Sequence, residues 1–275
     1  MQTLRSISRL ILGQSFHAGN AVCLSYLLWN FVSSLSGIRL EIGSMAAQLS
    51  TVDFSLPVRA MNARQCVLPD GTSFKLHVNT SMLCNDTGGD AWKGSWALAT
   101  LLNLRRTQLA GKRVLELGSG TGLLGISCAL SGATSVIVTD LPYVLPLIQK
   151  NISSAVVQQV VGAFEWDWSN PRPAFDSDLP FDVVVAADVV YDPEKLEICC
   201  SAIRSAADAC VEGGWIYIAL SYRSQLESQF LSALRQWATV EDLDSTAVSE
   251  AERLLFAQLD KACIATWRIR PKSWN

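Results

Sequence analysis

The chain has few of the residues that build metal centres or nucleic-acid surfaces. It contains only two histidines, and its eight cysteines form no C-x-x-C pair, which argues against a zinc site. Its formal net charge is −3, so it lacks the basic footprint of a nucleic-acid-binding protein. Several cysteines fall within apolar patterns, and we interpret them as reduced, buried thiols of an intracellular protein. We therefore expect no metal and no nucleic-acid partner.

Formal charge is also absent from residues 10–38, a stretch long enough to span a bilayer. Gln, Asn, His and Ser interrupt it, which is poor for a membrane helix. Residues 1–44 carry three arginines against one glutamate, a composition that fits an organelle transit peptide. Three interpretations stay open: a transit peptide, a membrane helix or anchor, or an extension without a structural role if Met45 is the true start. We expect a cytoplasmic protein without a firm membrane partner, with organelle targeting as the alternative.

The most informative stretch is VLELGSGTGL at residues 114–123. An apolar strand runs into a turn with glycine at positions 118, 120 and 122, and an apolar helix is predicted over 123–130. Glycine lets the backbone pass close to a ligand. The turn then places that ligand at the N-terminus of the following helix. The spacing differs from the G-x-G-x-x-G of dinucleotide turns, because Leu123 stands where the third glycine would be.

Two acidic residues accompany this turn. Glu116, two residues before the first glycine, would repel a pyrophosphate but suit a cationic, hydroxyl-bearing ligand. Asp140 ends a β-branched run 22 residues after Gly118, where an acid binds ribose hydroxyls. Its alternative role is to cap the next helix. S-adenosylmethionine has an amino group, a sulfonium and a ribose but no phosphate, so the two acids favour it as the ligand.

Strands alternate with helices downstream, which is typical of a mostly parallel, doubly wound α/β sheet. We divide the chain into a leader (1–44), a lead-in with short strands (45–90) and the α/β domain (91–275). One helix is predicted to carry Trp92 through Leu109, with Gly111 as its cap. Other helices are predicted to start at Asp192-Pro193 and to cover 226–237. Strands are predicted at 113–117, 134–139, 160–166, 181–187, 215–220 and 261–269, with a shorter one at 74–78.

Ligands of such sheets bind outside the carboxyl ends of the strands, so Glu116, Asp140 and Asp188 should face one crevice. Asp188 and Tyr191 lie three residues apart on the loop after strand 181–187, and both can reach an incoming amine. The alternatives are a helix-capping or loop acid for Asp188 and an aromatic lid packed on the core for Tyr191.

Two tryptophans are further candidates for this crevice. Trp92 lies at the start of the helix before the first strand, in position to close over the methionine end of the ligand. Trp166 follows the third strand, where an adenine would lie, and can stack on that base. The alternative for each is simple core packing, which is the commoner role of a tryptophan at a strand end.

Together these motifs resemble the seven-β-strand nonhistone protein-lysine methyltransferases, which modify chaperones and translation factors in eukaryotes. The resemblance covers roughly residues 74–275. It is closest to the elongation factor 2 lysine methyltransferase branch, although that branch has a longer N-terminal region than residues 45–90 supply. The target protein therefore stays open. The matching segments are Thr87-Gly88, Trp92, residues 114–122, Asp140, Glu165-Trp166-Asp167, Ala186–Tyr191 and Pro193-Glu194.

The resemblance implies a seven-stranded class I methyltransferase fold, Rossmann-like, with S-adenosylmethionine as cofactor. It implies that Asp188 and Tyr191 face the lysine of a protein substrate, a translation factor or chaperone, and we expect a monomer. The alternatives are a class I methyltransferase acting on a small molecule and a non-catalytic binding protein. Residues expected at the cofactor are Trp92, Glu116, Gly118, Ser119, Gly120, Gly122, Asp140, Trp166 and Ala187.

Overall fold

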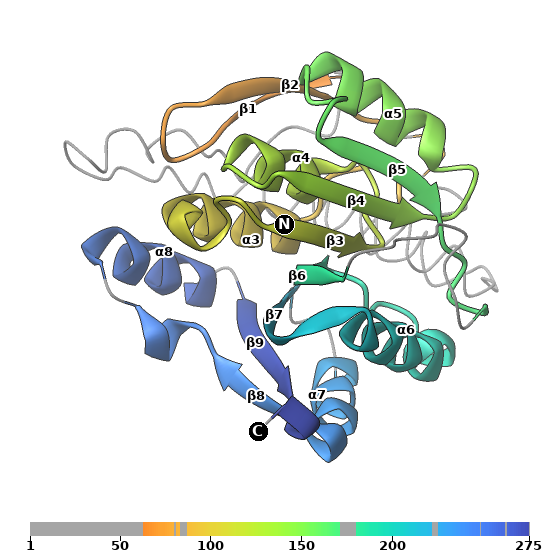
Figure 1. The fold of residues 1–275 in the computed structure, drawn as a ribbon, viewed down its shortest axis with the longest axis vertical. Coiled ribbons are helices and arrows are strands. Elements are labelled where there is room, and N and C mark those ends of the chain that lie inside the picture. The colour runs from red at the N-terminus through yellow and green to blue at the C-terminus, as the bar shows by residue number, and fades with distance from the viewer. Residues whose placement is uncertain are drawn as a thin grey trace, which may run out of the picture.

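A twisted seven-stranded sheet forms the centre of the structure, a computed structural model (Figure 1). It describes residues 63–79, 81–82, 87–170, 180–221, 225–247, 249–261 and 263–274, so the leader at 1–44 lies outside the described residues. The strand order is β5-β4-β3-β6-β7-β9-β8. Strands β3 to β7 run parallel, and β9 is antiparallel to β7 and β8. This confirms the mostly parallel, doubly wound α/β fold.

The strands of the sheet are short except at its centre. Their bounds are β3 (Arg113–Leu117), β4 (Ser135–Asp140), β5 (Val161–Glu165), β6 (Phe181–Ala187), β7 (Cys210–Ser221), β8 (Ala238–Asp242) and β9 (Ile264–Pro271). In β6, Val183 and Val185 join the core on one face, while Val184 and Ala186 join the core on the other. A strand covered on both faces needs such a continuous apolar run.

Helices cover both faces of the sheet (Figure 1). On one face lie α3 (Lys93–Leu104), α4 (Leu123–Leu130), α5 (Leu145–Ser154) and α8 (Glu250–Lys261). On the other lie α6 (Leu196–Asp208) and α7 (Leu226–Trp237). Single-turn 3₁₀ helices occur at η3 (Arg106–Gln108), η4 (Pro193–Lys195), η5 (Asp244–Thr246) and η6 (Lys272–Trp274). Among the residues that the structure describes, no helix has both the length and the apolar character to cross a membrane.

A separate β-hairpin, β1 (Ala63–Val67) with β2 (Ser73–His77), packs beside α5 and confirms the short strand expected near residue 74. The buried Asn151 side chain of α5 holds it in place. Its Oδ1 accepts from the His77 backbone N–H at 2.6 Å, and its Nδ2 donates to the carbonyls of His77 and Thr121 at 2.9 and 2.8 Å. One side chain thus joins the hairpin to the glycine turn.

Three predicted boundaries are wrong. The strand expected at 215–220 begins at Cys210, as β7. The helix expected to reach Leu109 ends at Leu104 and continues as η3, and Gly111 lies beyond it with a φ of +77°. The strand expected from residue 261 begins at Ile264, because α8 extends through Lys261, with Leu255 and Leu259 buried one turn apart.

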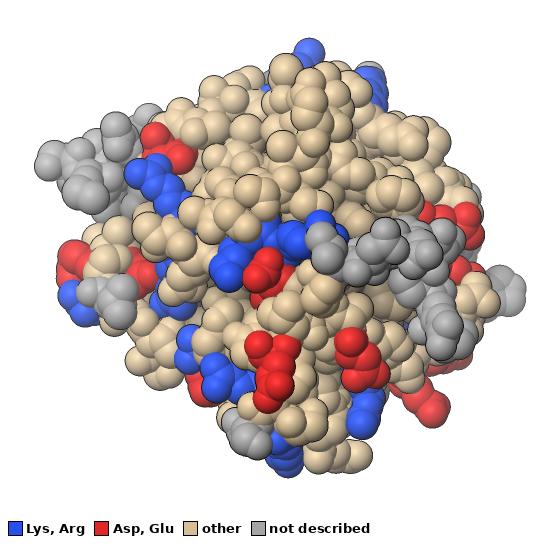
Figure 2. All heavy atoms as spheres, in the orientation of Figure 1, with Lys and Arg blue, Asp and Glu red and all other residues tan. Residues whose placement is uncertain are grey.

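Surface charges of both signs are interspersed on the face shown in Figure 2. One pair, in contrast, is buried: Arg105 Nε donates to Glu252 Oε1 at 2.7 Å, with side chains 6% and 3% exposed. Glu252 Oε2 also accepts from the Ser249 backbone N–H, and Ser249 Oγ accepts in return from the Glu252 N–H. This capping box starts α8 while the ion pair fastens α8 to the end of α3.

We expect Glu252→Ala to lower the free energy of unfolding by about 3–5 kcal/mol. The substitution leaves the buried Arg105 guanidinium without its carboxylate partner and removes the cap of α8. The matched control is Glu250→Ala in the same helix. It breaks the exposed Arg253–Glu250 pair, whose side chains are 58% and 74% exposed, and should cost at most about 1 kcal/mol. Denaturant unfolding of both variants measures the difference, and equal losses would show that the buried pair does not fasten α8.

Candidate active site

The loop between β3 and α4 requires glycine for its backbone shape. Gly118, Gly120 and Gly122 have φ values of +61°, +54° and +78°, in the left-handed region that side chains disfavour. At Gly118 there is also no room, since a Cβ would lie 3.1 Å from the side chains of Trp168 and Val189. The backbone therefore passes directly against the residues that follow β5 and β6.

Glu116 lies beneath this loop and not in the wall of the cavity, which corrects the expectation that it flanks the ligand. Alternation along β3 turns its side chain toward α4, where Oε2 accepts from the Gly125 backbone N–H at 2.9 Å. The side chain is 2% exposed. Burial raises its pKa to about 8, against the opposing effect of hydrogen bonds from Ser119 and Gly125. Gly122 also lies outside the wall and faces Ile148 of α5.

Asp140 ends β4 at the edge of the cavity. Its Oδ2 accepts from the Gly120 backbone N–H at 2.7 Å, and its Oδ1 accepts from the Leu141 N–H at 2.8 Å. The alternative role as a helix cap is not realised, because α5 begins at Leu145 without a side-chain cap. Asp140 thus fixes the glycine loop while it lines the cavity.

The two tryptophans after β5 differ in their surroundings. Trp166 is 3% exposed, belongs to the core and also lines the cavity, and donates from Nε1 to the Asn170 carbonyl at 3.3 Å. Trp168 covers Gly118, and its buried indole N–H has no acceptor among the described residues. Sequence reasoning missed Trp168 as a site residue, although it stands two positions after Trp166 in the same aromatic motif.

Asp188 joins three elements at the end of β6. Its Oδ2 accepts from the Gly94 N–H in the first turn of α3 at 2.6 Å, and its Oδ1 accepts from the Ser221 N–H at the end of β7 at 2.8 Å. It is 8% exposed and has a φ of +52°, uncommon for a residue with a side chain. The alternative role as a helix-capping acid is therefore realised, at α3.

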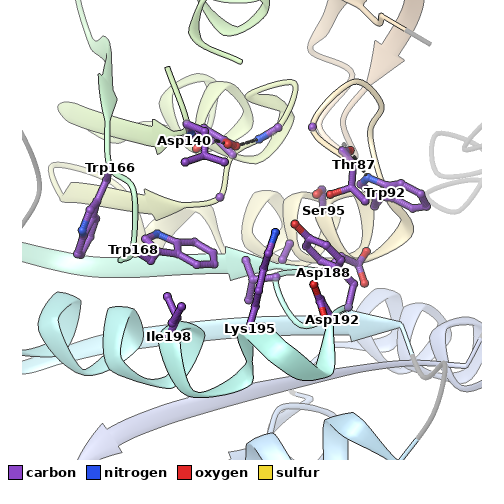
Figure 3. A pocket seen from close by; sticks show the side chains of 18 of the residues that line it. Thr87, Trp92, Ser95, Asp140, Trp166, Trp168, Asp188, Asp192, Lys195 and Ile198 are labelled. Atoms are coloured by element: carbon purple, nitrogen blue, oxygen red, sulfur yellow. Dashed lines mark hydrogen bonds between the residues drawn. The ribbon is translucent and has the colours of Figure 1, made fainter. Parts of the chain in front are cut away.

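Trp92, at the start of α3, and Tyr191, in the loop after β6, both line the cavity. Trp92 occupies the N-cap position of α3, and its indole N–H donates to the Thr87 carbonyl at 2.8 Å. Tyr191 follows β6, and Lys195 Nζ lies 5.8 Å from the centroid of its ring. Figure 3 shows Trp92 at the edge of this cavity.

The loops after β3, β4 and β6 enclose a cavity of about 330 Å³ (Figure 3). It contains nine of the predicted site residues, and Glu116 and Gly122 are the two that lie elsewhere. The nine are Trp92, Gly118, Ser119, Gly120, Asp140, Trp166, Ala187, Asp188 and Tyr191. Residues that sequence reasoning did not assign to the site include Trp168, Ser95, Asp192 and Lys195.

The chemistry of this cavity fits S-adenosylmethionine. Its size is in the range of small-molecule sites, about 300–1,000 Å³. Trp168 supplies a donor that needs an acceptor. The charged residues of the wall are one lysine and five aspartates, namely Lys195 and Asp90, Asp140, Asp167, Asp188 and Asp192. Asp90 is paired with Arg64 at 2.9 Å, and the other four aspartates leave an acidic balance that attracts an ammonium and a sulfonium and repels phosphate.

The fold and this cavity define a class I methyltransferase. The sequence profile of a family described as lysine methyltransferase matches residues 72–237, more than half of the chain, and the chain belongs to that family. By family it is an S-adenosylmethionine-dependent protein-lysine methyltransferase with a protein as its substrate.

Several curated proteins support this assignment. The chain is 30% identical over 203 residues to protein-lysine methyltransferase METTL21E of Bos taurus, covering 66% of this chain and 67% of that protein. It is 32% identical over 149 residues to protein-lysine N-methyltransferase EFM2 of Saccharomyces cerevisiae, covering 46% of this chain but only 35% of that protein. It is 31% identical over 137 residues to EEF1A lysine methyltransferase 3 of Mus musculus, covering 49% and 56%.

Solved structures support the fold. A protein of Streptococcus mutans assigned to the S-adenosylmethionine-dependent methyltransferases superposes with a TM-score of 0.52 at 17% identity, covering 78% of this chain and 57% of that chain. A second methyltransferase structure, determined with SAH, the demethylated form of the cofactor, gives the same TM-score, identity and coverage. At this identity the likeness concerns the fold alone.

Glu116 should make stability depend on pH. Its pKa is about 8 in the folded chain and about 4.5 in the unfolded chain, so the folded state holds the proton more tightly. The free energy of unfolding should therefore fall as pH rises from about 5 to 8. Glu116→Gln keeps an acceptor for the Gly125 N–H and should flatten this dependence. Denaturant titrations across this range measure it, and identical slopes for the two proteins would contradict a neutral Glu116.

Asp140→Ala should weaken S-adenosylmethionine binding by about 1.5–3 kcal/mol, because a carboxylate that faces the cofactor accepts charge-assisted hydrogen bonds. Calorimetry on the full chain measures the affinity. The control is Asp208→Ala, which removes an exposed acid at the end of α6, remote from the cavity. Unchanged affinity in Asp140→Ala would exclude this residue from the cofactor contacts.

Proposed function

We propose that this chain transfers methyl groups from S-adenosylmethionine to a lysine of a translation elongation factor. The observation that carries the proposal is the cavity, in which Asp140 lies toward one end and Trp92 and Asp188 toward the other (Figure 3), and which the glycine loop and Tyr191 also line. The choice of elongation factor is supported by the mouse relative, whose name states EEF1A as its substrate.

The chain's own residues divide the task between binding and alignment. Asp140, held by the Gly120 N–H, binds the ribose hydroxyls, and Trp168 offers beside the same loop an indole N–H that has no acceptor among the described residues. When bound, S-adenosylmethionine supplies an electrophilic methyl group on a positively charged sulfur. The aspartates of the wall other than Asp90, which is paired with Arg64, favour that charge. No covalent bond to the protein is needed, because methyl transfer is a direct displacement.

Alignment of the acceptor amine falls to Asp188 and Tyr191. Each oxygen of the Asp188 carboxylate accepts one backbone N–H, and the carboxylate lies in the wall of the cavity, where it faces the entering lysine amine. Tyr191 forms an apolar wall that lowers the pKa of the entering lysine and so favours its neutral, nucleophilic form. Positioning of this kind supplies up to about 7–11 kcal/mol of a barrier in favourable cases.

The test uses the purified full chain with methyl-labelled S-adenosylmethionine and three separate acceptors: elongation factor 1A, elongation factor 2 and an Hsp70 chaperone. We expect label on a single lysine of one elongation factor, located by mass spectrometry and lost when that lysine is changed to arginine. Label on the chaperone alone would overturn the choice of substrate. Label that appears only in small molecules of a cell extract would overturn a protein acceptor.

Asp188→Ala should lower turnover on the identified acceptor on the order of 100-fold while cofactor affinity changes little. Loss of its carboxylate frees the first turn of α3 from the end of β7, and it removes the acceptor that faces the amine. The measurements are kcat with the protein substrate and cofactor affinity by calorimetry, with thermal unfolding to confirm folding.

Tyr191→Phe is the matched comparison, because it keeps the ring that forms the wall. It should lose less turnover than Asp188→Ala. Equal losses of affinity and turnover in Asp188→Ala would instead place Asp188 in the cofactor site.

A further inference from the structure

One lysine of the enzyme itself lies in the wall of its own cavity. Lys195 ends η4, four residues after Tyr191, and its Nζ lies 5.8 Å from the centroid of the Tyr191 ring. Figure 3 shows its side chain rising between Trp168 and Asp188, with the nitrogen toward the cavity. This is the space in which a substrate lysine has to meet the methyl donor.

The backbone that carries Lys195 is fixed at the rim. Asp192 Oδ1 accepts from the Glu194 N–H at 3.0 Å, and Pro193 holds the first position of the turn. The side chain, by contrast, is exposed, and within the described residues its ammonium forms no ion pair. A cation–π contact with an exposed cation is worth only about 0.5–1 kcal/mol. The amine is therefore anchored beside the cavity but free to turn into it.

We propose that Lys195 is a site of self-methylation. The inference rests on the proposed methyl transfer and extends it to an acceptor within the chain. The ammonium of the exposed Lys195 first loses a proton to water. The nitrogen lone pair then forms the new N–C bond as the S–C bond breaks and its electron pair stays on sulfur.

The contact with Tyr191 remains possible after the reaction. A methylated lysine keeps its positive charge, and methylated ammonium groups bind well to aromatic faces. The modified side chain would therefore stay at the rim, where a protein lysine has to enter.

The first experiment incubates the purified full chain with S-adenosylmethionine carrying a trideuterated methyl group, without protein substrate, at a cofactor concentration shown by calorimetry to saturate the site. Fragmentation mass spectrometry should locate trideuteromethyl groups on Lys195 and not on Lys75 or Lys150, which are exposed outside the cavity. Lys195→Arg should lose this label. The fraction labelled per unit time should be the same across a dilution series, because donor and acceptor belong to one molecule.

The second experiment does not depend on turnover. The chain is acetylated briefly with an amine-reactive ester, with and without S-adenosylhomocysteine, and the extent of acetylation is measured at each lysine. Acetylation of Lys195 should fall severalfold when this product is bound, while Lys75 and Lys150 react equally in both samples. Unchanged reactivity of Lys195 would show that its amine does not share the cofactor cavity.

The two proposals fail separately. Unlabelled Lys195 under saturating cofactor overturns self-methylation, whether or not an elongation factor is methylated in a parallel reaction. Labelled Lys195 with no label on either elongation factor supports self-methylation and overturns the proposed substrate.

Discussion

The site depends on one constraint of the sheet: β3, β4 and β6 are parallel neighbours, so their carboxyl ends meet at one edge. Three loops must share that space, and the helices after β3 and β6 leave on opposite faces. The turn after β3 has glycine at the point of closest approach, where a Cβ at Gly118 would lie 3.1 Å from the side chains of Trp168 and Val189. The cavity is the volume that these loops leave unfilled.

Carboxylates hold this edge together before any ligand binds. Glu116, Asp140 and Asp188 each accept a backbone N–H from a neighbouring loop or helix. They differ in solvation, and this difference decides their roles. Glu116 is sealed beneath α4, where burial favours the neutral acid. Asp140 and Asp188 line the cavity, where we propose that the ligand binds. The same two carboxyl groups therefore support the loops and form part of the cavity wall.

The rim after β6 combines a fixed backbone with a movable side chain. The Asp192 cap fixes η4, and Tyr191 gives Lys195 a weak resting contact. An aromatic ring beside acidic residues attracts the ammonium of an approaching lysine, whether that lysine belongs to a substrate or to the enzyme itself. The aromatic ring and the acidic wall that suit the lysine of a protein substrate therefore also suit Lys195.

The sequence by itself determined the parts of this protein that rest on local pattern. Alternating glycines before an apolar helix and β-branched runs ending in Asp140 and Asp188 located the strands and brought these acids to one crevice. The edge strand β8 has one buried residue in five and no apolar run, so it left no signal. Only the tertiary structure decided that Glu116 turns away from the cavity and that Trp168 covers the glycine loop while Trp166 packs in the core. The physical reason is that a side chain's surroundings depend on which helices cover each face of the sheet, and those contacts join residues far apart in the chain.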